Sequence, residues 1–381
     1  MTHDIRFEGD LDPALAEVRE LLLEAARERQ GYGAQLCIMR DGRPLVDVVV
    51  GDRLERDSVT GVYSTTKGVA ALTVARLIDE ERLSLDQRVA DLWPEFAAAG
   101  KDQVTVGQLL SHQVGLPVID RVVPLAELLD SRLGAARLAS QRPLWVPGSA
   151  FGYHGITIGI LIEELVRRAD GRELRDAHEQ DIRAPRDADF YIGMPASEDH
   201  RYVPVAPMEP TDEQREEIAS RPQGDPLSSL MFGNFEAGAE WDEDGIITNN
   251  PAVRRAGPAG IGGTGSARGL ARLYASALPG AQDAIASPET FAAMRQMRSW
   301  GTDRSLGITN AFGAVFMLPQ PRMPFGTLEA FGHDGGGGAL AFADPGTGVS
   351  FGYIPVPMQY PGGADPVAVR IARTVRDVLA G

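Results

Sequence analysis

The chain has 381 residues, of which 43% are hydrophobic, as in an ordinary globular protein. This length predicts two packed units or one unit with a large insertion, because a domain usually holds about 100 to 200 residues. The 53 acidic and 37 basic residues give a formal charge of −16. Such a charge repels phosphate backbones and anionic lipid head groups, so neither nucleic acid nor a membrane surface is expected as a partner.

The start of the chain and its single cysteine bear on its location. Residues 1–7 lack the basic start and the apolar stretch of a secretion signal, and no later segment approaches about 18 uninterrupted apolar residues. Cys37 lies in an apolar run and is predicted to be a buried small hydrophobe, and one cysteine forms no disulfide within a chain. We therefore expect a soluble, cytoplasmic protein.

The first predicted elements are a helix and two antiparallel strands. A proline follows Asp12, and apolar residues then recur at helical spacing, which predicts a helix over 12–29. Apolar runs over 34–40 and 44–51 are joined at Asp41-Gly42, a strong hairpin signal. Residues 65–79 are rich in Ala, Val and Leu, as expected of a helix that is buried on most sides.

The remaining elements form a helical middle and a strand-rich end. Further helices are predicted over 106–112, 125–139, 156–168, 266–278 and 365–379. Further strands are predicted over 313–318, 338–343 and 348–354. The stretch 204–263 is dense in Pro, Gly and acidic residues, and predicts extended loops over a site mouth, with a merely solvated excursion as the alternative.

This order of elements predicts an α+β fold. Strands at both ends of the chain, with helices between them, imply one sheet assembled from both termini and a helical domain inserted in the middle. The expected division is a discontinuous sheet domain, residues 1–80 and 255–381, and a mostly helical domain, residues 81–254, with long loops at the site mouth.

Two serine motifs compete for the role of nucleophile. Residues 348–352 match the G-x-S-x-G elbow around Ser350, which needs a strand, a sharp turn and then a helix. The prolines at positions 355 and 357 cannot open such a helix. Ser350 is therefore predicted to lie within a strand, without a catalytic role.

Ser64 and Lys67 form an S-x-x-K motif at the start of the buried helix. Residues i and i+3 share a helix face, so the lysine amine can reach the serine hydroxyl. The helix N-terminus offers unpaired amides and a positive dipole end to a developing negative charge. Burial destabilises an ammonium, so Lys67 can be neutral enough to accept the serine proton. The alternative, a capping serine with a surface lysine, fits the apolar helix poorly.

Two further motifs supply what this helix lacks. Tyr153 lies in a turn that leads into the helix predicted over 156–168. The segment 331–338 contains His333 and ends in four glycines, whose backbone a substrate carbonyl can approach, so one of their amides can complete an oxyanion hole. A phosphate-binding loop is a poor alternative, because a strand-like segment and not a helix follows the glycines.

Together these motifs resemble those of class C β-lactamases, DD-peptidases and, most closely, family VIII carboxylesterases. The resemblance covers most of the chain, from the hairpin to the last helix. It implies a β-lactamase/transpeptidase-like fold, with an antiparallel sheet flanked by helices and an inserted, mostly helical domain. It also implies that Ser64 is acylated, that Lys67 and Tyr153 move protons, and that the amides of Ser64 and Gly336 stabilise the oxyanion.

Two departures from the family pattern bear on the substrate. An asparagine usually stands two residues after the tyrosine and contacts the amide of peptide-like substrates; here that position is Gly155. A lysine that meets the substrate carboxylate in β-lactamases is replaced by His333. Losing both contacts favours neutral esters. Gly335 and His154 complete the predicted substrate-binding set.

The histidines predict no metal site. His154 follows the tyrosine and can tune its pKa, with a solvent-facing or hydrogen-bonded structural histidine as the alternative. The six histidines are scattered, and there is neither an H-E-x-x-H motif nor a cysteine pair, so neither a metal nor a cofactor is expected. His112, His178 and His200 are predicted to be structural.

The leading hypothesis is a serine esterase that acts on a small-molecule ester through an acyl-enzyme. An acyltransferase of the same superfamily differs only in its acceptor, and a weak β-lactamase or D-amino-acid peptidase is the next alternative. A catalytically silent binding module on the same fold is disfavoured by the intact set of Ser64, Lys67 and Tyr153. The acyl and alcohol groups and the oligomeric state stay open.

Overall fold

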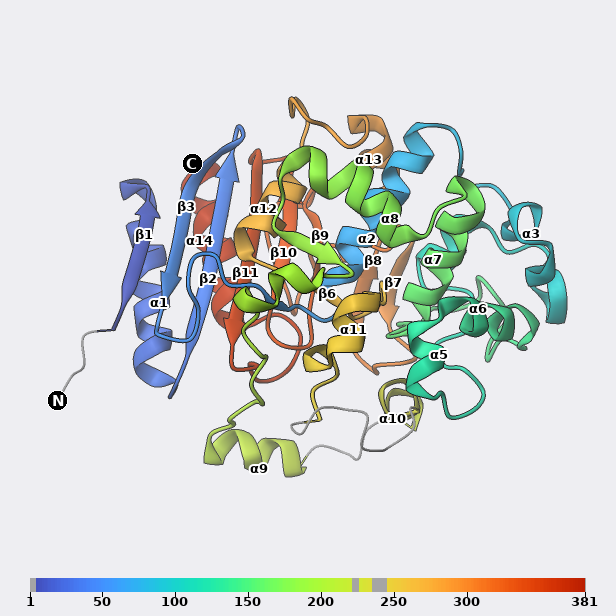
Figure 1. Cartoon of the computed structure of the whole chain (residues 1–381), viewed down its shortest axis with the longest axis horizontal. Coiled ribbons are helices and arrows are strands. Elements are labelled where there is room, and N and C mark those ends of the chain that lie inside the picture. The colour runs from blue at the N-terminus through green and yellow to red at the C-terminus, as the bar shows by residue number, and fades with distance from the viewer. Residues whose placement is uncertain (1–4, 221–225, 235–244, 381) are drawn as a thin grey trace.

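A six-stranded antiparallel sheet joins the two ends of the chain in the computed structural model, which describes residues 5–220, 226–234 and 245–380 (Figure 1). The strands in spatial order are β1 (Phe7–Leu11), β3 (Arg43–Val50), β2 (Gly33–Arg40), β11 (Val349–Val356), β10 (Leu340–Asp344) and β9 (Phe331–Asp334). The first three come from the start of the chain and the last three from its end. The predicted sheet assembled from both termini is confirmed.

The hairpin of β2 and β3 follows from its turn residues. Asp41 and Gly42 have φ of 52° and 71°, the left-handed conformation that a two-residue hairpin turn requires. Along β2, Leu36 and Ile38 pack with one buried cluster and Cys37 with another, because side chains alternate between the two faces of a strand. The sheet is therefore apolar on both faces and needs cover on both.

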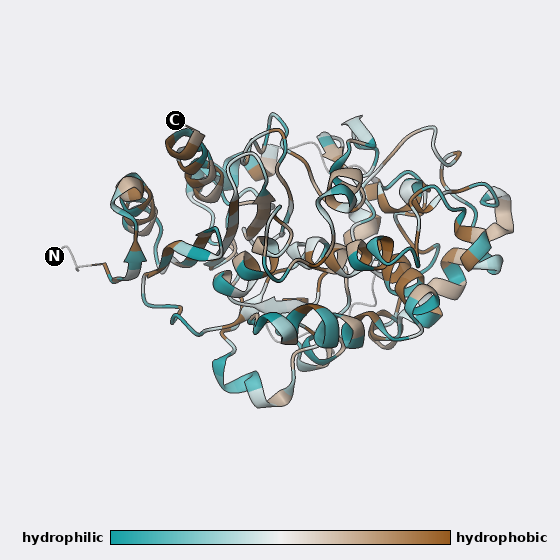
Figure 2. Cartoon of the chain, turned by 90° about the horizontal axis from the view of Figure 1, so that it is seen from above, coloured by the Kyte–Doolittle hydropathy of each residue, from teal (hydrophilic) through white to brown (hydrophobic). Residues whose placement is uncertain are grey.

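Helices from distant parts of the chain cover these faces. Helices α1 (Ala16–Glu28) and α14 (Pro366–Ala380) belong to the cluster on one face, and α2 (Thr65–Asp79) and α12 (Ala267–Ala275) to the cluster on the other (Figure 1). Hydrophobic residues gather inside the molecule and hydrophilic ones along its outer helices (Figure 2). Helix α2 is buried along nearly its whole length, as predicted.

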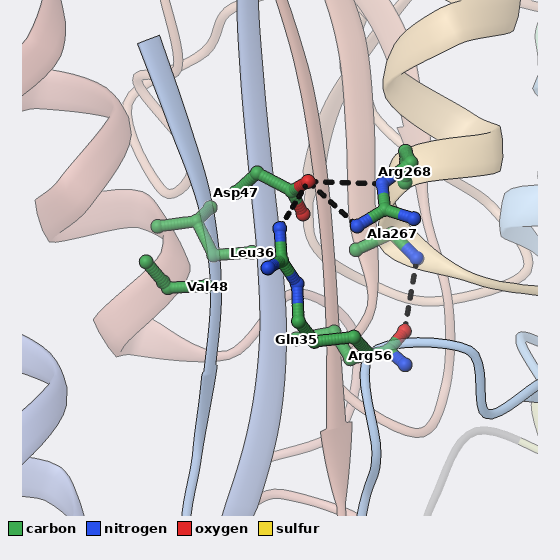
Figure 3. A pocket seen from close by; sticks show the side chains of 7 residues that line it. All are labelled: Gln35, Leu36, Asp47, Val48, Arg56, Ala267 and Arg268. Atoms are coloured by element: carbon green, nitrogen blue, oxygen red, sulfur yellow. Dashed lines mark hydrogen bonds and ion pairs between the residues drawn. The ribbon is translucent and has the colours of Figure 1, made fainter. Parts of the chain in front are cut away.

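A charged contact fixes α12 on the sheet, in the pocket shown in Figure 3. The Asp47 carboxylate on β3 accepts hydrogen bonds from the Arg268 guanidinium at 2.6 and 2.9 Å and from Arg56 at 3.0 Å. The amide of Ala267 donates to Gln35 Oε1 at 3.1 Å. The residues that line this pocket include none of the candidate catalytic residues.

The remaining strands and helices surround α2 and the far end of the sheet. The small strands are β4 (Thr60–Gly61), β5 (Phe190–Ile192), β6 (Gly263–Gly265), β7 (Ser299–Thr302) and β8 (Thr309–Phe312). The other helices are α3 (Val89–Leu92), α4 (Val106–Leu110), α5 (Leu125–Leu129), α6 (Ser131–Ser140), α7 (Thr157–Asp170), α8 (Leu174–Ala177), α9 (Asp212–Ser220), α10 (Pro226–Gly233), α11 (Pro251–Ala256) and α13 (Pro288–Arg295). Within the described ranges, no helix combines the length and the apolar character that crossing a bilayer requires.

Three element predictions were wrong. The single helix over 125–139 is two helices, because Asp130 leaves helical geometry and its carboxylate caps α6 at the Arg132 amide. The strand over 313–318 is an irregular buried segment in which Val315 has a φ of 67°. The stretch 204–263 was expected to be loops but contains α9, α10 and α11; residues 221–225 and 235–244 within it lie outside the described residues. The domain division at 81–254 stays a prediction.

Candidate active site

Ser64 stands at the N-terminus of α2, where the chain leaves β4. Its predecessor Tyr63 has a φ of 51°, a left-handed conformation that is unfavourable for a tyrosine and is held here by the surrounding structure. Ser64 itself is the N-cap residue, and its side chain makes no capping bond to the helix. The hydroxyl is half-buried and free to take part in other contacts.

Lys67 lies one turn further along α2, entirely buried, with its amine directed at the serine. The Nζ atom is 2.8 Å from Ser64 Oγ and donates a hydrogen bond to the Gly260 carbonyl at 2.6 Å. Burial lowers the pKa of the lysine to about 7, although the charge of Asp334 opposes the shift. A neutral amine that donates to Gly260 keeps its lone pair for the serine hydroxyl. Lys67 therefore has both the geometry and the protonation state of a general base.

Tyr153 closes the other side of the serine. Its phenol is hydrogen-bonded with Ser64, and its ring centroid lies 5.1 Å from Lys67 Nζ. Burial raises the pKa of Tyr153 above its ordinary value, although the bond with Ser64 opposes the shift. The tyrosine is thus a phenol at neutral pH and can donate a proton, while Lys67 is the group able to accept one.

Two backbone amides flank the serine, those of Ser64 and Gly336. In the described part of the chain, neither donates a hydrogen bond to another group. The turn after β9 approaches the segment before Ser64 so closely that a Cβ at Gly335 would lie 2.1 Å from the Val62 carbonyl oxygen. The glycine at 335 permits this approach and brings the amide of its neighbour toward the serine, as an oxyanion hole requires.

His333 is buried on β9 and is neutral at physiological pH. Burial, together with the charge of Lys67, lowers its pKa to about 4, against the opposing effect of Asp334. Its Nδ1 lies 2.7 Å from the Asp334 carbonyl oxygen and must carry the proton there, so Nε2 is an acceptor. His333 therefore supplies no positive charge for a substrate carboxylate.

His154 has both ring nitrogens engaged, so the structure favours the hydrogen-bonded structural interpretation over a solvent-facing one. The Leu116 amide donates to Nε2 at 2.9 Å, and Nδ1 donates to the Gly152 carbonyl at 2.6 Å. His112, predicted to be structural, holds the same turn, because its Nδ1 accepts from the His154 amide at 3.1 Å and its carbonyl from the Gly152 amide at 3.1 Å. The two histidines shape the turn that presents Tyr153.

Sequence reasoning missed Asp303, which positions the backbone of Tyr153. This fully buried carboxylate accepts hydrogen bonds from the amides of Tyr153 at 2.9 Å, Ser305 at 2.8 Å and Leu306 at 3.0 Å, and from Asn310 Nδ2 at 2.9 Å. Burial raises its pKa, and these bonds oppose that shift. No motif marks Asp303, because its partner lies 150 positions away in the sequence.

The contact continues from Asp303 to the third motif. Asn310 Oδ1 accepts from Arg322 Nη2 at 2.9 Å, and Arg322 Nη1 lies 3.8 Å from Asp334 Oδ2. The Asp334 charge in turn acts on Lys67. This polar chain links the tyrosine turn to the residues beside the lysine.

Replacing Asp303 by asparagine should lower kcat by about 10- to 100-fold, because the amide cannot accept from Asn310 and a small displacement of Tyr153 is costly in a reacting geometry. Asp344→Asn is a matched control: this buried aspartate accepts from the Thr327 and Gly346 amides at the opposite end of β10. Both variants should lose roughly 1–3 kcal/mol of stability. Steady-state kinetics and thermal unfolding separate the effects, and equal kcat values in the two variants would refute the positioning role.

Comparison with known proteins agrees with this geometry. A family model described as Beta-lactamase matches residues 18–362, nearly the whole chain. The chain belongs to the beta-lactamase family. Esterase/beta-lactamase LipL of Mycobacterium tuberculosis is 31% identical over 370 residues, covering 91% of this chain and 82% of the relative.

Solved structures extend this family membership to the whole fold. EstA from Arthrobacter nitroguajacolicus Rue61a is 38% identical, covers 98% of both chains and superimposes with a TM-score of 0.88. A family VIII carboxylesterase is 31% identical, with 98% of this chain and all of that chain covered and a TM-score of 0.86. The β-lactamase/transpeptidase-like fold is therefore confirmed. Within the described ranges, this beta-lactamase family member brings no three metal-ligating side chains together.

Proposed function

We propose that this protein is a serine hydrolase that cleaves carboxylic esters through an acyl-enzyme on Ser64. The observation that carries the proposal is the buried amine of Lys67, with a pKa of about 7 and 2.8 Å from Ser64 Oγ. The names of the relatives support the ester substrate: LipL is an esterase/beta-lactamase, and a structure 31% identical is a family VIII carboxylesterase.

The acylation step uses each of the grouped residues. Lys67 accepts the hydroxyl proton as Ser64 Oγ attacks the ester carbonyl, and the amides of Ser64 and Gly336 stabilise the oxyanion. The C–O bond to the alcohol then breaks, and the departing alkoxide takes a proton from the Tyr153 phenol, which Lys67 replenishes. A water molecule releases the acid: it loses a proton to the same base, its oxygen attacks the acyl carbonyl, and Ser64 leaves with a proton.

Neutral esters are the substrates that the site's charges favour. His333 is uncharged above a pH of about 4, so a carboxylate on the substrate finds no cation at this position. Gly155 offers no side-chain amide to an acyl-amide group. A charge-assisted hydrogen bond contributes roughly 1.5–3 kcal/mol, or about one to two decades in binding.

Wild-type protein should hydrolyse neutral short-chain p-nitrophenyl esters with a far higher kcat/KM than nitrocefin or cephalosporins. The reason is that the two missing contacts recognise only the lactams, whereas the acyl-transfer groups serve any acyl donor. His333→Lys should narrow the gap by improving the lactam more than the ester. Nitrocefin turnover as efficient as that of the best simple ester would replace the esterase assignment by β-lactamase.

The alternatives are tested by the same preparation. Weak β-lactamase activity deserves a measured value, because the name of LipL carries both activities. An added alcohol that captures the acyl group in preference to water would favour an acyltransferase. A serine-reactive phosphonate that fails to label the protein would favour a silent binding module. The cytoplasmic location stays a prediction from the sequence.

A further inference from the structure

We propose that α10 forms an apolar subsite beside Tyr153, in which Phe232 selects esters that carry a hydrocarbon group over esters that carry a polar one. This inference rests on the proposed ester hydrolysis and specifies the substrate group that the same site accepts. Three observations on α10 carry it.

The first observation is that α10 fills the space in which a side chain at position 155 would stand. A Cβ on Gly155 would lie 2.9 Å from Phe232 Cε1 and 3.0 Å from Met231 Sδ. The Gly155 amide donates to that sulfur at 3.0 Å. The backbone two residues after Tyr153 is thus covered by a phenyl edge and a thioether, which offer no hydrogen-bond donor. A polar substrate group placed here would lose its water without a strong partner.

The second observation is a division of roles between the two side chains. Met231 is 2% exposed and belongs to the buried apolar cluster that contains Tyr153, Phe151 and Phe312. Phe232 is 53% exposed, so its ring reaches residue 155 and still has a free surface. Met231 therefore holds α10 against the tyrosine turn, and Phe232 presents aromatic surface that a substrate hydrocarbon can cover.

The third observation is that the end of α10 is tied to the segment before α5. Asn234 Nδ2 donates to the carbonyl oxygens of Ile119 and Arg121, both at 2.7 Å. The Val123 amide donates to the Asn234 carbonyl at 3.0 Å. Phe232 thus stands two residues from a fixed point, and a supported aromatic ring loses little freedom when a substrate packs on it.

The test measures kcat/KM of the full-length protein over two ester series. The first varies the acyl chain of p-nitrophenyl esters from acetate to octanoate, and the second varies the alcohol of acetate esters from ethyl to octyl. Phe232→Ala should lower the octanoate-to-acetate or the octyl-to-ethyl ratio by about tenfold, since each buried methylene is worth about fourfold in binding. Phe232→Leu, which keeps an apolar side chain, should retain most of the ratio.

Leu230→Ala is the matched control. Leu230 is 51% exposed on the same helix, and side chains two positions apart point to different faces. This variant should leave both ratios unchanged, and thermal unfolding should show that all three variants fold. A fall in the acyl series assigns the subsite to the acyl group, and a fall in the alcohol series assigns it to the alcohol.

Ratios that stay unchanged in Phe232→Ala, or that fall equally in Leu230→Ala, would overturn the subsite while leaving ester hydrolysis intact. Wild-type protein that turns over no ester of either series would overturn the proposed function itself, and the subsite with it.

Discussion

Ser64→Ala should abolish ester hydrolysis, with a loss on the order of 10⁴-fold or more in kcat. The alanine keeps the helix, the backbone amide at position 64 and the bond from Lys67 to Gly260, so only the attacking oxygen is removed. The fold should therefore persist, as thermal unfolding will show, while release of p-nitrophenol falls to background.

Ser350→Ala is the control that separates the two serine motifs. Ser350 lies in the middle of β11, fully buried, and its hydroxyl has no partner among the described residues. The prediction that this serine belongs to a strand is confirmed. Removing an unpaired buried hydroxyl should leave activity intact and stability unchanged or slightly higher. If this variant were the inactive one, the elbow motif would hold the nucleophile.

Lys67→Arg should be nearly as inactive as Lys67→Ala, with each variant losing on the order of 10³-fold or more in kcat. A guanidinium keeps the positive charge but cannot accept a proton, so charge alone will not restore the reaction. Single-turnover kinetics of acylation measure the effect directly. Substantial activity in the arginine variant would show that Lys67 contributes only charge.

The pH profile of the wild type gives a second measure of the same base. With a lysine pKa of about 7, kcat/KM should rise with pH below 7, as the ammonium loses its proton, and level off above it. Stability has the same sign. Between the lowered pKa and the ordinary value of 10.5, the unfolded chain binds the proton that the folded chain does not, so this lysine destabilises most below pH 7 and less as the pH rises.

Local patterns predicted the elements that local chemistry determines. The bounds of α2 agree with the predicted 65–79, because its apolar composition is helical by itself, and the hairpin follows from Asp41-Gly42. The segment 313–318 misled because an apolar run records burial and not conformation. Its backbone is bent by contacts with other parts of the chain, such as the bond from the Val315 amide to the Leu110 carbonyl.

The candidate site divides in the same way. Ser64, Lys67 and Tyr153 stand in short motifs, so their residue types and spacing are visible in the sequence. Gly260 and Asp303 reach them from 193 and 150 positions away, through a backbone carbonyl and a single carboxylate that no local pattern marks. Such partners become visible only when the fold brings them together.

Mass spectrometry of the protein mixed with a p-nitrophenyl ester and quenched in acid tests the central claim most directly. The account predicts that the intact protein gains the mass of one acyl group, that the modified peptide contains Ser64, and that Ser64→Ala gains none. Lys67→Ala should accumulate the adduct far more slowly, since the base is missing. An adduct on Ser350, or ester turnover by Ser64→Ala at the wild-type rate, would contradict the account.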